Sequence, residues 1–189
     1  MTDDAAGESP GSRRQLLASA LGAGILLAGC GHGNSLHSRV KQVGPVAPAD
    51  ARTLNQLLDL EHLMIAAYTA SIPLLDSDAA DAAKRFLGQE LSHAGELSGL
   101  VKQSGGKAHK PMASYDLGRP RGSEQVLALL HRIERAQLAA YVHALPTLSQ
   151  PKVRAATAAV MANDAQHVSV LRAKLGLSPL PSAFVTGRE

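Results

Sequence analysis

Residues 60–68 read LEHLMIAAY, and residues 133–141 read IERAQLAAY. A second polar motif follows each segment: ELSH at residues 90–93 and DAQH at residues 164–167. The two motifs therefore occur twice, in the same order and at nearly the same offset. A repeat of this kind indicates two related structural units joined in one chain.

The apolar residues around these motifs recur at spacings of three and four, which is the pattern of amphipathic helices. We expect helices at about residues 49–72, 77–104, 123–148 and 151–176. Pro146 should bend or end the third helix because proline lacks the backbone N–H that an interior position needs. The repeat thus consists of two helical hairpins.

The connections between the predicted helices differ in length. The first and third are short, whereas residues 105–122 form a longer segment between the second and third helices. A segment of this length can run along a whole bundle and start the next helix at the opposite end. The sequence therefore predicts an all-α four-helix bundle with one long crossover between helices two and three.

Six polar residues interrupt the apolar faces of these helices. A buried carboxylate without a partner is very costly, so it must be protonated, paired or bound to a metal. The acids within each hairpin lie equally far from the turn and should be level with each other. We interpret the set as ligands of a metal pair, while a protonated or water-filled interior without metal remains the alternative. The six residues are Glu61, Glu90, His93, Glu134, Asp164 and His167.

One glutamate from each of two helices, with an acid-x-x-His pair from each of the other two, forms the ligand set of carboxylate-bridged di-iron and di-manganese bundles. Over about residues 50–176 the chain resembles this ferritin-like family. The resemblance implies that Glu61 and Glu134 are terminal ligands, that Glu90 and Asp164 bridge the two metals, and that one histidine caps each metal. Asp164 departs from the family pattern because its side chain is one methylene shorter than glutamate.

Tyr68 and Tyr141 lie two helical turns after the first glutamate of each hairpin. They are therefore on the same helix faces as Glu61 and Glu134. We expect them to be core tyrosines that form hydrogen bonds near the metal site.

The predicted function is binding of two iron ions, with manganese as the alternative, because carboxylates and imidazoles suit both metals. Ferroxidase-like chemistry with oxygen or peroxide is the simplest activity, and a manganese catalase-like reaction is a second one. The alternative is a non-enzymatic cell-envelope lipoprotein that uses the bundle as a binding or structural module. The short, proline-containing segment 177–189 predicts a C-terminal tail without a fifth helix.

The N-terminal residues are typical of an export signal. SRRQLLA, which contains Arg13 and Arg14, resembles a twin-arginine signal, and LAGC, which ends at Cys30, resembles the lipobox of bacterial lipoproteins. The apolar run between them is too short to span a membrane. The resemblance implies that residues 1–29 are a signal peptide for the twin-arginine export machinery and that a lipid on Cys30 anchors an extracytoplasmic protein to the membrane. Residues 30–49 would then be a flexible tether.

The composition limits the remaining classes of function. The chain has 19 basic and 16 acidic residues, and no basic run is interleaved with aromatic residues, so we expect no nucleic-acid partner. Cys30 is the only cysteine, which excludes an internal disulfide. The sequence leaves a monomer and a homodimer open.

Overall fold

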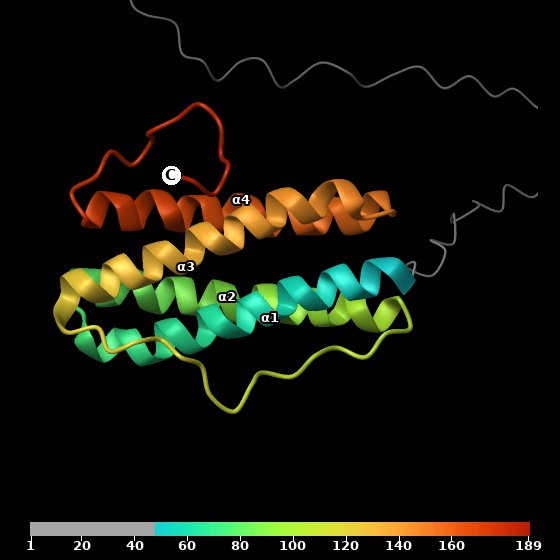
Figure 1. Cartoon of the computed structure of the whole chain (residues 1–189), viewed down its shortest axis with the longest axis horizontal. Coiled ribbons are helices and arrows are strands. Elements are labelled where there is room, and N and C mark those ends of the chain that lie inside the picture. Colours follow the sequence, from blue (N-terminus) through green and yellow to red (C-terminus); the bar gives the residue numbers. More distant parts are fainter. Residues whose placement is uncertain (1–47) are drawn as a thin grey trace, which may run out of the picture. The chain divides into compact units, whose positions relative to one another are not determined.

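The computed structural model describes residues 48–189, which form an all-helical bundle (Figure 1). Its four long helices are α1 (Pro48–Ser71), α2 (Ser77–Gln103), α3 (Gly122–Ala144) and α4 (Pro151–Lys174). Short 3₁₀ turns, η1 (Ile72–Leu74) and η2 (Leu145–Thr147), follow α1 and α3. The described residues contain no strand. The predicted all-α four-helix fold is confirmed.

Helix α2 has clear start and stop signals. Its N-cap is Asp76, whose carboxylate accepts a hydrogen bond of 2.9 Å from the backbone N–H of Ala79. At its end, Gly105 has a φ of 74°. The N–H groups of Gly105 and Gly106 bond to carbonyls in the last turn of the helix, which is the Schellman motif. A residue with a Cβ is disfavoured at this φ, so glycine suits this stop.

Helix α3 is shorter than expected. The periodicity predicts a helix to about residue 148, but α3 ends at Ala144 and the chain continues as η2. Pro146 explains the difference, because it cannot donate the next helical hydrogen bond and its ring crowds the preceding turn. Pro151 then starts α4 at a position where the missing N–H costs nothing.

Helices that are joined by a short connection pack mainly against each other. Helix α1 packs mainly against α2, α3 packs mainly against α4, and α1 also contacts α3. The crossover leaves the end of α2, runs along the bundle and begins α3 at the opposite end (Figure 1). Asn55 of α1 fixes its first part, because its side chain donates to the Lys107 carbonyl at 3.0 Å and accepts from the His109 N–H at 2.8 Å. The predicted single long crossover is confirmed.

The core consists of two apolar clusters at different heights in the bundle. One contains Leu54, Leu57, Leu97 and Val160, together with other buried aliphatic side chains. The other is built around residues such as Tyr68, Phe86 and Leu130. The six polar residues singled out in the sequence occupy helix positions between these two clusters, so a polar layer crosses the interior where the clusters meet.

The C-terminal tail, residues 177–189, contains no helix and turns back beside α3 and α4 (Figure 1). Arg172 of α4 donates to the Ser178 carbonyl at 2.6 Å, and Gly187 lies against Ala139 of α3. Within residues 48–189, no helix is both long and apolar enough to cross a membrane. The predictions for Arg13, Arg14 and Cys30, and those for the signal peptide and most of the tether, concern residues outside the described part.

Candidate metal centre

The polar layer receives side chains from all four long helices. Glu61 comes from α1, Glu134 from α3, and one acid-x-x-His pair comes from each of α2 and α4. The four carboxylates are 0% exposed, His167 is 1% exposed and His93 is 9% exposed. A set of acids this deeply buried requires compensation by protons or cations.

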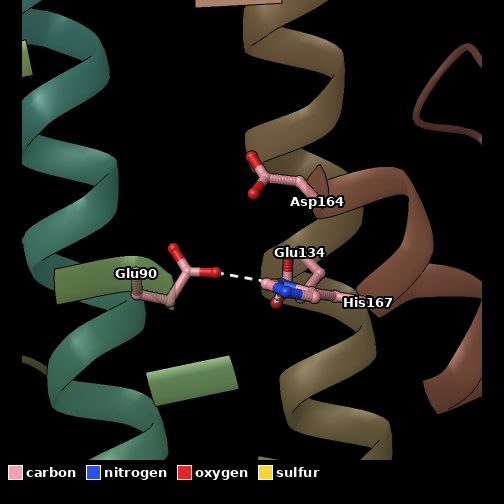
Figure 2. A group of neighbouring side chains, drawn as sticks. All are labelled: Glu90, Glu134, Asp164 and His167. Carbon is pink, nitrogen blue, oxygen red and sulfur yellow. Dashed lines mark hydrogen bonds and ion pairs between the residues drawn. The ribbon is translucent and has the colours of Figure 1, made fainter. Parts of the chain in front are cut away.

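Glu90, Glu134, Asp164 and His167 form the first group, and their side chains point toward one another (Figure 2). Each offers one ligand atom, and these atoms all lie within 4.8 Å of one another. His167 Nδ1 lies 3.0 Å from Glu90 Oε1 and 3.1 Å from Glu134 Oε1. Three oxygens and one nitrogen at this spacing fit a single cation of the first transition row.

Glu61, Glu90 and His93 form the second group, whose ligand atoms also lie within 4.8 Å of one another. His93 Nδ1 is 3.7 Å from Glu61 Oε2 and from Glu90 Oε2, and 3.3 Å from Asp164 Oδ1. Glu90 belongs to both groups, and Asp164 of the first group also faces His93. The arrangement therefore offers two adjacent positions that share carboxylates.

The unpaired atoms of the layer fit a bound cation. Apart from ion-pair contacts with the imidazoles, each of the four acids has one buried oxygen without a hydrogen-bond partner: Oε2 of Glu61, Oε1 of Glu90, Oε2 of Glu134 and Oδ1 of Asp164. His93 Nδ1 likewise has ion-pair contacts but no hydrogen-bond partner. Buried polar atoms nearly always have hydrogen-bond partners in proteins, so a concentration of ligand atoms without hydrogen bonds in one layer suits metal ions.

The charges of the layer compensate one another without metal. Burial alone would lower the pKa of His93, but the carboxylates of Asp164, Glu61 and Glu90 outweigh it and raise that pKa to about 12. Glu134 and Glu90 likewise outweigh burial and raise the pKa of His167 to about 9. In the metal-free protein, the positive charges of the protonated imidazoles therefore balance the carboxylates. A metal ion that binds here must displace these protons.

The pKa values of the buried glutamates shift in different directions. Burial raises the pKa of Glu61 well above its ordinary value, and it raises that of Glu134 to about 7. Burial also acts on Glu90, but its close contacts with the imidazoles of His167 and His93 outweigh burial and lower the Glu90 pKa. Glu90, which is common to both groups, is thus the acid most readily ionised.

The two tyrosines connect the hairpins. Tyr68 of α1 donates a hydrogen bond of 2.5 Å to Glu134 Oε1 on α3, and Tyr141 of α3 donates to Glu61 Oε1 on α1. Each hydroxyl therefore orients the glutamate of the other hairpin. Burial, together with the nearby carboxylates, raises both tyrosine pKa values well above the ordinary value, so both hydroxyls keep their protons.

His167 is oriented from outside the layer. Its Nε2 lies 2.7 Å from Gln89 Oε1, and its ring stacks on Phe86 with a centroid distance of 4.1 Å. Because an amide oxygen can only accept, Nε2 keeps its proton, and Nδ1, which faces the carboxylates, is the nitrogen that would lose its proton to a metal. A partner of this kind fixes the nitrogen that is presented to a metal.

Two glutamines of the site, Gln89 and Gln137, were not predicted from the sequence. Gln89 directly precedes Glu90, and Gln137 is fully buried three residues after Glu134. The helical spacing from Glu134 to Gln137 was a signal that could have identified the second residue, because it places both on one face. No comparable signal existed for Gln89. All six predicted ligands lie in the polar layer, and their binding of metal stays a prediction.

Comparison with known proteins gives a family and a fold. A family model described as a ferritin-like domain matches residues 49–177. Among solved structures, the chain is similar to the crystal structure of a conserved hypothetical protein, rv2844, from Mycobacterium tuberculosis, with a TM-score of 0.65 and 20% sequence identity. The match covers 72% of this chain and 96% of that one, and at this identity it shows the fold alone. No curated protein matches the chain.

Proposed function

Because the chain belongs to the ferritin-like domain family, we propose that it is an exported, lipid-anchored protein that binds two metal ions. The ions are iron, and the centre reacts with oxygen or peroxide. Manganese is the alternative metal, since the same donors suit both. The observation that carries the proposal is the buried layer of four carboxylates and two imidazoles supplied by all four helices.

Each residue of the layer is assigned to one ion position or to both. Glu134 and His167 serve one position, Glu61 and His93 serve the other, and Glu90 serves both. Asp164 lies within the first group and 3.3 Å from His93 Nδ1, so it also adjoins both positions.

Bound iron would supply the electrons that reduce oxygen or peroxide. The protein contributes orientation and the exclusion of bulk water. The two tyrosine hydroxyls hold Glu61 and Glu134 in place, and Gln89 fixes His167. Complete burial of the carboxylates keeps bulk water away and strengthens their interaction with a cation.

The first test counts metal ions. The full chain carrying Cys30→Ser, which prevents lipid attachment, is prepared without metal and titrated anaerobically with Fe(II). We expect about two ions per chain. Glu90→Ala combined with Glu134→Ala should abolish this binding. The matched control is Glu96→Ala with Glu124→Ala, because these glutamates are exposed on the same two helices.

Oxygen is then added to the loaded protein. Growth of an iron absorption band in the near ultraviolet, absent from the double variant, supports an oxidase. Stoichiometric binding without a reaction towards oxygen or peroxide supports the non-enzymatic envelope module instead. Absence of stoichiometric binding of Fe(II), Mn(II) and Zn(II) contradicts the metal proposal and supports an interior that is protonated or filled with water.

Export and anchoring have a separate test in a bacterial host. We expect the unchanged chain in the membrane fraction outside the cytoplasm. Cys30→Ser should move it to a soluble fraction, and Arg13→Lys with Arg14→Lys should leave the precursor in the cytoplasm. An unchanged distribution of both variants would contradict a lipid anchor and twin-arginine export.

A further inference from the structure

Gln137 of α3 lies inside the metal centre and has no role in the proposed ligand set. It is 0% exposed. Its amide nitrogen Nε2 lies 3.2 Å from Glu61 Oε1, 3.4 Å from Glu90 Oε2 and 3.3 Å from Asp164 Oδ2. These three acids come from three different helices, so a single amide group connects α1, α2 and α4 to α3.

The distances are those between neighbouring ligands. Oxygens at adjacent corners of an octahedral cation lie about 3 Å apart when each metal–oxygen bond is about 2.1 Å long. The terminal atom of Gln137 stands at nearly this distance from three carboxylate oxygens at once. It therefore occupies the place of a further ligand atom next to those oxygens.

The other terminal atom of the amide is unpaired. Gln137 Oε1 is buried and makes no hydrogen bond. Rotation about the last side-chain bond exchanges Nε2 and Oε1, and the two atoms are nearly equal in size. An amide N–H that faces a cation is repelled, whereas an amide oxygen is an established ligand for such cations. Metal would therefore favour the rotated amide.

From this geometry we infer that Gln137 is a ligand of the ion held by Glu61, Glu90 and His93, through Oε1 after the amide rotates. The inference rests on the proposed binding of two ions. The second group of the centre has three residues and the first has four. Gln137 brings the second group to four and supplies a neutral oxygen that the first group lacks.

The internal repeat predicts that the two metal positions are unequal. The residue of α1 that corresponds to Gln137 is Met64, which is also 0% exposed. A thioether is a soft ligand that suits Cu(I) better than Fe(II) or Mn(II). The two halves of the centre therefore differ at this pair, and the amide ligand serves one ion alone.

The test replaces Gln137 with methionine, the residue type found at the corresponding position of α1. The full chain carrying Cys30→Ser, with or without Gln137→Met, is titrated anaerobically with Fe(II) and separately with Mn(II), and both stepwise affinities are measured. We expect one ion to bind unchanged and the other to bind about tenfold or more weakly in the variant. Gln137→Glu, which offers a carboxylate oxygen, should restore the weakened step. Gln166→Met, an exposed change on α4, is the matched control and should bind as the unchanged chain does.

The outcomes separate the inference from the proposed function. If the unchanged chain binds two ions and Gln137→Met binds both as tightly, or binds the second more tightly, Gln137 is no ligand and the inference is wrong. If the unchanged chain binds none, the proposed function fails with it. Helical circular dichroism checks folding, and Gln137→Asn, which withdraws the amide by one methylene, gives the same test if the methionine variant does not fold.

Discussion

Glu61 illustrates the conflict between stability and metal binding at the scale of one residue. Burial and the nearby acids raise its pKa well above the ordinary value, so its ionised form is disfavoured in the metal-free protein. Glu61→Gln keeps an oxygen that can accept the hydrogen bond from Tyr141. The layer holds four acids and only two imidazoles, and a shift of one pKa unit corresponds to about 1.4 kcal/mol. We therefore expect the metal-free variant to gain about 1 kcal/mol in free energy of unfolding at neutral pH. It should lose the metal position that Glu61 serves, as measured by denaturant unfolding and Fe(II) titration.

Glu96→Gln is the control for this prediction, since Glu96 is exposed on α2 and should change neither quantity. A metal-free Glu61→Gln protein that is less stable by about 1 kcal/mol or more would contradict the prediction. That result would mean that the ion pair with His93, at 3.7 Å, outweighs the cost of burying the charge.

At this scale the sequence predicts side chains that lie on a helical face better than those that support them. Glu61 and Glu134 could be identified because they interrupt an apolar stripe and recur in the repeat. Tyr68 and Tyr141 could be placed near the centre by the same spacing. The hydrogen bond from each tyrosine to the glutamate of the other hairpin could not be predicted, because it depends on how the two hairpins dock. Gln89 was missed because its contact with His167 crosses from α2 to α4.

At the scale of elements, Asp76 holds the start of α2 and the start of α3 together. Its carboxylate accepts from the Ala79 N–H at 2.9 Å and from the Ser123 hydroxyl at 2.8 Å. These hydrogen bonds lower its pKa below the ordinary value of 3.8. A lowered folded-state pKa means that the stabilisation is present above pH 3.8 and is lost as the pH falls through the folded-state value.

We therefore expect Asp76→Ala to lower the melting temperature at neutral pH. The difference from the unchanged chain should shrink in acid below the Asp76 pKa, as followed by thermal melts at several pH values. Asp81→Ala is the control, because its ion pair with Lys84 is largely exposed and contributes little. A difference that stays constant down to the lowest pH would mean that the carboxylate charge does not matter.

The element bounds show which local signals are reliable. The paired glycines after α2 and Pro151 at the start of α4 predicted two helix ends to within a residue, because their backbone preferences are strong. The end of α3 was less certain, since Pro146 allows either a bend or a stop. The structure has a stop followed by a 3₁₀ turn, and the apolar periodicity of residues 145–148 could not distinguish the two.

At the scale of the whole molecule, metal should stabilise the fold. Ions that bind only the folded state add about 2.7 kcal/mol per site when free metal is a hundredfold above the dissociation constant. We expect a chelator to lower the melting temperature of the loaded protein by several degrees in differential scanning calorimetry. The Glu90→Ala, Glu134→Ala variant should melt at one temperature with and without metal. Equal melting temperatures of the loaded and chelated unchanged chain would contradict the prediction.

The division of the ligands between two hairpins also has a kinetic consequence. Neither α1 with α2 nor α3 with α4 contains the whole set, so the centre is complete only once the hairpins have docked. The ion of the first group takes Glu90 from one hairpin and Glu134, Asp164 and His167 from the other, so it can be captured only at the end of folding. The hairpins can separate only after these ligands release it. Bound metal would therefore lengthen the lifetime of the folded state, because the protein cannot unfold faster than this ion dissociates.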